Sequence, residues 1–389
     1  MKELNLFPMA ALLILVSCAN RPTFMQHEVV FYAKLGDQVN QLGSNIPILN
    51  AAAATNTDMI IDDYLDLPSS IQIFRNRVYI ADKYNRRVSI FPLGGKATNN
   101  TPILSKGEGY EFGYPFQVLV NRYEEVFVLA SATYNSNSLA QPDGDTNVNQ
   151  YYIYKFSRDG KFIFTIGVNG IHTEAMPYPD RIDIDLFDNL YAYFKQVNTN
   201  NGSDSWLVKR YSSSGELNFE FQTKYLSPTN VIGDNTYIGR ISDIYNLKND
   251  ERLLIYSENV IAKKKDQEVT VPDDFYLSLD VYSVLQNSIT KNIFKSKKFI
   301  DGLVGVTDDD IVALYSYDDR WKGVRFRFVD ILNKGKSSVE EYYAPLVTDP
   351  FRFGKYFIDS KGQIYATVLK DYDTFFIIRW KKVKSKVNG

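Results

Sequence analysis

The sequence predicts an all-β fold, a six-bladed β-propeller whose last blade is closed by an N-terminal strand. Three observations lead to it. A strand-rich unit recurs six times along the 389 residues, aromatic residues make up 14% of the chain, and the last unit lacks a fourth strand. Tyrosine and phenylalanine favour the half-buried surface of a sheet. Regular repetition of a short strand unit is the sequence signature of a propeller.

The best-formed unit spans residues 71–91 and contains three strands separated by two turns. Its second strand, Val-Tyr-Ile-Ala at 78–81, has a counterpart in each of the other units. These counterparts begin at Val126, Leu190, Leu253, Ile311 and Ile364. Turn residues such as Asp188-Asn189 and Lys361-Gly362 precede several of them and supply the tight reversal. The unequal spacing of the copies therefore reflects loops of different length.

First strands and the closing strand follow from the same pattern. Four first strands begin at or just after a proline, namely Pro68, Pro115, Pro179 and Pro350. Proline at a strand start removes no hydrogen bond from the ladder. The sixth unit ends near Trp380 without a fourth strand, whereas residues 29–36 resemble the fourth strand at 162–167. We therefore expect residues 29–36 to complete the last blade and remove the exposed sheet edge.

The N-terminus contains an apolar run at residues 6–16, which is shorter than the roughly 20 residues that span a bilayer and fits a signal peptide. Leu15-Val16-Ser17-Cys18 resembles the lipobox of bacterial lipoproteins. That resemblance implies cleavage before Cys18 and covalent lipid, such as palmitate, on this residue. The alternative is a plain signal or short anchor with Cys18 incidental. The expected domains are a signal peptide at 1–17, a lipidated tether at 18–28 and the propeller at 29–389.

One unit also resembles a known repeat. Residues 68–96 contain Val-Tyr-Ile-Ala-Asp at 78–82, an Asn85-Arg86 turn and Gly-Gly-Lys at 94–96. This stretch resembles an NHL repeat, and the other five units are degenerate copies. The whole chain is similar to NHL-like envelope lipoproteins of spirochaetes. The resemblance implies a propeller attached to a membrane of the bacterial cell envelope, and leaves open whether it faces the periplasm or the outside.

The order of strands in a propeller assigns the loops to two faces. We call the face with the second-to-third-strand loops and the blade-to-blade loops the top face, and the opposite one the bottom face. Polar loops at 37–67, 132–150, 196–205 and 257–274 should project from the top face, where long loops commonly carry function. The lipid tether and the lysine-rich tail at 381–386 should share the bottom face. The tail is either a solvated terminus or a contact for anionic headgroups.

Residues for catalysis are scarce. The two histidines, His27 and His172, are too few for a histidine-rich zinc site, and the single cysteine is Cys18. We therefore expect no enzyme, no catalytic residue and no cofactor beyond the covalent lipid. Weak candidate metal ligands are Asp143, Asp145 and Asn147, whose alternation loosely resembles a calcium loop but lacks its glycine and distal glutamate. A solvated polar loop is the alternative for these residues.

Aromatic and arginine residues in the top-face loops are better candidates, because Trp and Arg are enriched in binding hot spots. The candidate partner-binding residues are Tyr134, Asn135, Trp206, Arg320 and Trp321. The alternative for the two tryptophans is packing against their own blades.

The function expected from these features is a lipid-anchored envelope protein that binds a protein partner through its top face. A small-molecule binder or calcium-dependent hydrolase using the central channel is the alternative, and Asp183 and Asp185 on an inner strand either line that channel or sit near a turn. The formal net charge of −2 gives no long-range attraction to nucleic acid, so we expect no nucleic-acid partner.

The two-face assignment predicts a labelling result. Single cysteines at Ser136 and Lys386 should differ, with Ser136→Cys reacting freely in membranes and Lys386→Cys lying close to lipid. A probe quenched by lipid at position 136 and free at position 386 would contradict the assignment.

Overall fold

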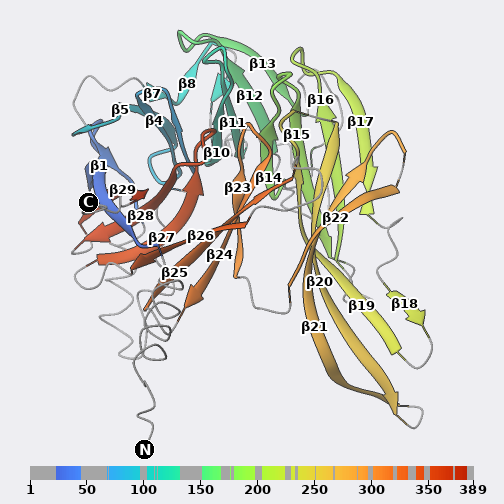
Figure 1. Cartoon of the computed structure of the whole chain (residues 1–389). Helices are drawn as coiled ribbons and strands as arrows, with labels where there is room; N and C mark the ends of the chain where they lie inside the picture. The colour runs from blue at the N-terminus through green and yellow to red at the C-terminus, as the bar shows by residue number, and fades with distance from the viewer. Residues whose placement is uncertain are drawn as a thin grey trace, which may run out of the picture.

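The computed structural model is built from β-strands (Figure 1). It describes residues 23–44, 68, 70–96, 103–108, 110–111, 113–131, 151–167, 176, 179–197, 204–223, 229–232, 235–249, 251–265, 268–286, 288–296, 301–318, 322–331, 339–345, 351–370 and 373–382. Over these ranges the chain contains no α-helix, and so none that is long and apolar enough to cross a membrane.

Six sheets form the blades of a propeller, as the sequence predicts. Neighbouring strands within a blade come in chain order, except that the sixth blade takes its last strand from the N-terminus. Blades 1 to 3 contain β3 (Ser70–Phe74), β4 (Arg77–Asp82), β5 (Arg87–Pro92) and β7 (Ile103–Leu104); β10 (Pro115–Val120), β11 (Val126–Ser131), β12 (Tyr151–Phe156) and β13 (Phe162–Ile166); and β14 (Arg181–Ile184), β15 (Leu190–Val197), β16 (Asp204–Tyr211) and β17 (Leu217–Gln222).

The second half of the ring repeats the pattern. Blades 4 to 6 contain β18 (Thr229–Ile232), β19 (Asn235–Asn246), β20 (Arg252–Lys265), β21 (Glu268–Ser283) and β22 (Ser288–Ser296); β23 (Gly302–Val306), β24 (Ile311–Asp318), β25 (Gly323–Asp330) and β26 (Val339–Pro345); and β27 (Phe351–Ile358), β28 (Ile364–Lys370), β29 (Thr374–Lys382) and β1 (Met25–Leu35). Short strands β2 (Gln41–Leu42), β6 (Gly95–Lys96), β8 (Lys106–Gly107) and β9 (Tyr110–Glu111) lie outside this pattern.

The expected closing strand is confirmed. β1 pairs antiparallel with β29, from Met25 opposite Lys382 to Lys34 opposite Thr374, and so becomes the fourth strand of blade 6. It also pairs in parallel with β6 in the segment that follows β5 of blade 1. Phe24, just before β1, bridges to Tyr343 in β26 of blade 5. One N-terminal strand therefore touches three consecutive blades.

An ion-pair cluster reinforces this closure. Glu28 of β1 accepts a hydrogen bond from Arg379 Nε at 2.7 Å and pairs with Lys381, both on β29. The hydrogen bond from Lys381 is the largest cause that lowers the pKa of Glu28, and Arg379 adds to it. Because the folded-state pKa lies below the unfolded value, this contribution is present at neutral pH and is lost as the pH falls through the folded-state pKa.

Apolar side chains fill the six interfaces between neighbouring blades. Each interface has one cluster of buried residues, so each blade packs against a neighbour on both of its faces. At the closing interface, Phe31 of β1 packs against Phe91 of blade 1 with ring centroids 4.9 Å apart. This face-to-face packing of the twisted sheets is the core of the molecule.

Turns of one design connect the first and second strands on the bottom face. The first turn residue accepts hydrogen bonds from backbone N–H groups; for example, Asn121 Oδ1 accepts from Tyr123 and Glu125. The fourth turn residue has a positive φ, as at Glu124, Asp188, Asp310 and Gly362. The equivalent first residues are Asp185, Thr307 and Asp359. These repeated turns hold the bottom face in a fixed shape.

One expected loop is wrong. Residues 257–274 are not a polar loop, because β20 and β21 continue through them as a hairpin that pairs as far as Lys265 opposite Glu268. The loop expected at 196–205 is also shorter, since Gln196 pairs with Ser205 and Val197 with Asp204.

Ring closure predicts a large stability difference between two adjacent residues of β1. Phe31 is 1% exposed and Tyr32 is 40% exposed. Phe31→Ala should lower the free energy of unfolding by about 3–5 kcal/mol, because it leaves a cavity between blades 6 and 1. Tyr32→Ala should cost less than about 1 kcal/mol. Urea unfolding followed by tryptophan fluorescence measures both, and similar losses for the two variants would contradict a closure that depends on this interface.

Candidate functional site

Strand pairing places three chain segments at the same end of the ring, the top face. Ser131 pairs with Tyr151, Val197 with Asp204, and Asp318 with Gly323 at the strand ends that lead into these second-to-third-strand connections. The candidate residues Tyr134, Asn135, Arg320 and Trp321, the weak metal candidates Asp143, Asp145 and Asn147, and Cys18 lie outside the described residues.

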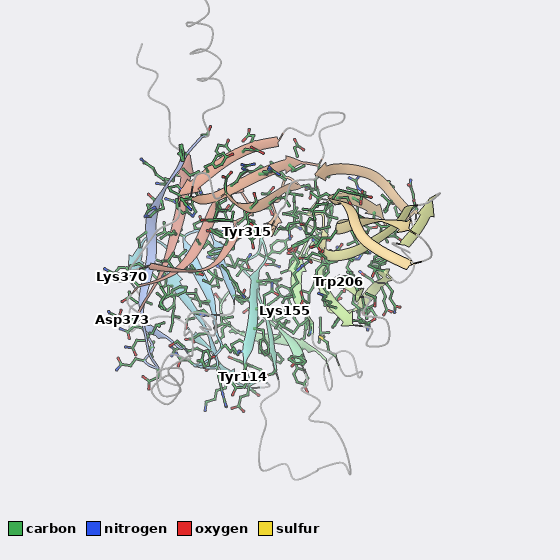
Figure 2. All side chains as sticks on the ribbon, turned by 90° about the horizontal axis from the view of Figure 1, so that it is seen from below. Tyr114, Lys155, Trp206, Tyr315, Lys370 and Asp373 are labelled. Carbon is green, nitrogen blue, oxygen red and sulfur yellow. The ribbon has the colours of Figure 1, made fainter. Side chains whose placement is uncertain are left out.

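Trp206 is described, and it lies in the interior (Figure 2). Its side chain is 2% exposed in the cluster between blades 3 and 4, and its Nε1 donates a hydrogen bond to the carbonyl of Ile241 at 3.0 Å. A partner therefore has no access to the indole. The packing role, which the sequence left open as the alternative, is the one that the structure assigns to Trp206.

The feature that the sequence did not predict is an arm on blade 4. β20 has 14 residues and β21 has 16, and their outer halves extend past the ring together with β18 and the first half of β19 (Figure 1). Because the tip of this arm is a second-to-third-strand connection, it belongs to the same face as the loops described above.

One edge of the arm has no neighbouring strand among the residues that the structure describes. Among the described residues, β22 pairs with β21 only from Leu277 onward, and the pairs given for residues 268–275 of β21 are with β20. The opposite edge of the arm is covered by β18. A row of backbone N–H and C=O groups on an unpaired edge is a template for another strand.

Inner strands of blades 3 and 4 hold a buried cation. The guanidinium of Arg181 lies between the rings of Tyr193 and Tyr245, 4.3 and 3.6 Å from their centroids, and pairs with Asp243. Burial alone would lower the pKa of Arg181, but Asp243 and the two phenols raise it, so the group stays charged. Burial raises the pKa of both tyrosines, which keeps them protonated.

The remaining donors of this guanidinium lack a partner among the described residues. Arg181 Nε and Nη2 are buried, and no hydrogen-bond acceptor meets them among the residues that the structure describes. Paired donors on one edge of an arginine match a carboxylate or a water.

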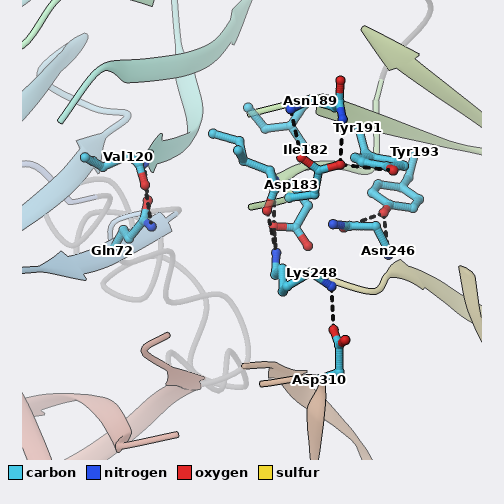
Figure 3. A network of polar contacts seen from close by, with 12 residues as sticks. Gln72, Val120, Ile182, Asp183, Asn189, Tyr191, Tyr193, Asn246, Lys248 and Asp310 are labelled. Carbon is cyan, nitrogen blue, oxygen red and sulfur yellow. Dashed lines mark hydrogen bonds and ion pairs between the residues drawn. The ribbon is translucent and has the colours of Figure 1, made fainter. Parts of the chain in front are cut away.

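Lys248 links three blades near the bottom face (Figure 3). Its Nζ pairs with Asp183 and donates to the carbonyl of Ile184 at 2.8 Å in blade 3. Its backbone N–H donates to Asp310 of blade 5 at 2.5 Å. Asp183 is thus an ion-pair partner, whereas Asp185 caps its own turn by accepting N–H bonds from Phe187 and Asn189.

Glutamines connect the inner strands of blades 1 to 3. Gln117 donates from Nε2 to the carbonyl of Ile182 at 2.8 Å and accepts from its N–H at 2.7 Å, and Gln72 makes the same double contact with Val120 (Figure 3). Each side chain mimics a strand neighbour and sets the offset between two blades. These polar contacts on the inner strands join blades, which is a structural role.

A cavity of about 1110 Å³ opens between blades 5, 6 and 1. Its lining includes Phe74, Asp309, Lys361, Tyr365 and Trp380, a mixture of aromatic and oppositely charged side chains. His27 packs edge-on against Trp380 at 5.2 Å between centroids. Across the described ranges no three His, Cys, Asp or Glu residues gather in a group that could hold a metal ion.

Comparison with known proteins finds distant structural neighbours and no family for this chain. No protein-family model and no curated protein matches the sequence. Among solved structures, hydrazine synthase of Kuenenia stuttgartiensis is 9% identical, with 78% of this chain and 95% of that chain covered at a TM-score of 0.41. The β-propeller domain of the Trilobed protease from Pyrococcus furiosus is 8% identical, with 78% and 79% covered at 0.39.

A third structure, endo-arabinase from Bacteroides thetaiotaomicron, is 12% identical, with 74% of this chain and 97% of that chain covered at a TM-score of 0.33. Likeness at these scores carries no argument about activity. The six-bladed propeller rests on the strand order and on the six interblade clusters.

The buried pair on blades 3 and 4 predicts a stability effect. Asp243→Asn should lower the free energy of unfolding by about 2–4 kcal/mol, because it leaves the Arg181 charge buried without its partner. Adding Arg181→Met should recover most of this loss. Asp373→Asn, which breaks the exposed pair with Lys34, is the control and should cost less than about 1 kcal/mol. Equal effects of the two single variants in urea unfolding would show that burial does not govern this ion pair.

Proposed function

We propose that this protein is a lipid-anchored scaffold of the bacterial cell envelope that binds a protein partner through the top face of its propeller. The lipobox-like Leu15-Val16-Ser17-Cys18 supports the anchor and the location. The NHL-like unit at 68–96 supports membership among NHL-like envelope lipoproteins. We propose no catalytic activity and no cofactor besides the covalent lipid on Cys18.

The observation that carries the proposal is the arm of blade 4. A propeller blade needs only strands that run from the bottom face to the top face. β20 has 14 residues and β21 has 16, so both continue well beyond this distance. The strand order assigns the end of the arm to the top face, together with the strand ends at Ser131 and Val197. Surface loops and extensions on a rigid scaffold are where binding commonly resides.

The mode of binding that fits this arm is strand addition. An extended segment of the partner would pair with the backbone edge at 268–275, where main-chain hydrogen bonds supply affinity and side chains supply specificity. Candidate contacts of the flanking loops are Tyr134, Asn135, Arg320 and Trp321.

The test is cross-linking and co-purification from native membranes with three forms of the full chain. The first is wild type. The second is an arm-shortened variant in which residues 261–274 are replaced by Asn-Gly, which joins the paired residues Val260 and Phe275 by a tight turn. The third lacks residues 136–149 of the neighbouring loop. A specific partner should appear with wild type and be lost, by about tenfold or more, from the arm-shortened variant.

The third form separates the contributions of arm and loop. Partial loss on removal of 136–149 would mean that loop and arm form one binding surface. An identical partner profile for all three forms, or no specific partner in any, would refute a scaffold that works through this face. Thermal unfolding of each variant confirms that the propeller remains folded.

A further inference from the structure

Three apolar side chains stand out on the bottom face. Among the large hydrophobic residues that the structure describes, the three most exposed are Leu285 at 85%, Phe187 at 61% and Tyr123 at 59%. All three sit in tight turns, in blades 4, 3 and 2 respectively. Large exposed apolar groups that gather on one face mark an interaction site.

A contact joins the turns of Tyr123 and Phe187, and strand pairing places the turn of Leu285 on the same face. Tyr123 and Phe187 occupy the third position of equivalent first-to-second-strand turns, and Arg122 Nε donates to Asp188 Oδ2 at 3.1 Å between the two turns. Leu285 follows β21, whose last residue Ser283 pairs with Arg252 at the start of β20. Its turn therefore lies beside the first-to-second-strand turn of blade 4, on the same face.

Hydrogen bonds from backbone N–H groups to side-chain oxygens fix each turn. The N–H of Phe187 donates to Asp185 Oδ1 at 2.8 Å, and that of Tyr123 donates to Asn121 Oδ1 at 3.1 Å. The N–H of Gln286, next to Leu285, donates to Ser283 Oγ at 3.3 Å. The apolar side chains are thus presented on rigid supports, which limits the entropy lost when they become buried.

Arginines surround the turn of blade 2 that carries Tyr123. Arg75 pairs with Glu124, and Arg158 Nε and Arg77 Nη1 lie 3.4 and 4.0 Å from its other carboxylate oxygen. Three exposed guanidinium groups thus share one buried carboxylate, which leaves an excess of positive charge at the edge of blades 1 and 2. Arg122 stacks over the ring of Tyr123 at 4.8 Å. Arginine beside exposed aromatic and aliphatic groups suits the boundary between headgroups and acyl chains.

The chain also enters and leaves the propeller on this face. β1 begins and β29 ends here, because Met25 pairs with Lys382. Cys18 precedes Met25 by few residues, so an extended tether reaches only about 25 Å. A lipid on Cys18 would bring the bottom face within that distance of the bilayer.

We propose that the bottom face docks on the bilayer, with Tyr123, Phe187 and Leu285 inserted at the interface and the arginines of blades 1 and 2 on anionic headgroups. This inference rests on the lipid anchor of the proposed function and adds a second membrane contact. It fixes the orientation of the propeller, with the blade 4 arm directed away from the membrane.

The test uses the full chain, purified with its lipid and reconstituted in vesicles of phosphatidylethanolamine and phosphatidylglycerol. An environment-sensitive fluorophore is attached to Phe187→Cys, and to Tyr317→Cys as the matched control. Tyr317 is an exposed aromatic residue near the end of β24, on the top face. Nitroxide-labelled lipids should quench the probe at position 187 at least about twofold and leave the probe at 317 unchanged. The mass of the mature chain reports the lipid on Cys18 separately.

Each other outcome overturns the docking. No quenching at 187 in a lipidated protein shows that the face stays in water. Equal quenching at 187 and 317 shows an unoriented propeller. A probe at 187 that is shielded from water but not quenched by lipid shows that a protein or a second copy covers this face. Leu285→Cys repeats the measurement on another blade. None of these results depends on partner capture by the top face, so the scaffold function is tested independently.

Discussion

Pairing of β1 with β29 is the constraint on which the rest of the structure depends. Six wedge-shaped blades bury their faces only if the ring is complete, and the last blade obtains its fourth strand from the opposite end of the chain. Phe31 then fills the space between blades 6 and 1, while Glu28 joins the strand to Arg379 and Lys381. Without this strand the sixth blade would expose an apolar edge and the first would lose its neighbour.

Local patterns in the sequence were sufficient for the fold. The apolar second strands and the turn residues before them predicted six blades, because each depends on neighbours in the chain. The closing strand was predicted because the last unit lacked a fourth strand and an unassigned strand remained at the N-terminus. The arm was missed because Lys, Asp and Pro at 263–274 resemble a loop, although Val260, Ile261, Val269 and Val271 flanking Asp266-Gln267 carried a strand and turn signal. The residues of the Arg181 cluster come from strands that are far apart in the sequence, so no local sequence pattern predicts the cluster.

Candidate site residues were predicted less well than the fold, because their exposure depends on contacts between blades rather than on neighbours in the chain. Trp206 was chosen because it follows a loop, but its place on β16 turns it into the interface between blades 3 and 4. Tip residues such as Phe187 and Leu285 escaped notice because a single apolar residue in a turn is unremarkable until neighbouring turns are seen to share a face. The strand order is therefore needed to recognise the exposed apolar residues of the bottom face as a group.

Closure by the two ends of the chain also sets the order of events during biogenesis. Glu28 and Arg379 are 351 residues apart in sequence, so the strand that emerges first waits for the strand that emerges last. Loop closure over such a distance is slow, and contacts of high sequence separation delay folding. The ring therefore stays open, with unpaired strand edges that are prone to aggregation, until β29 has been synthesised and pairs with β1.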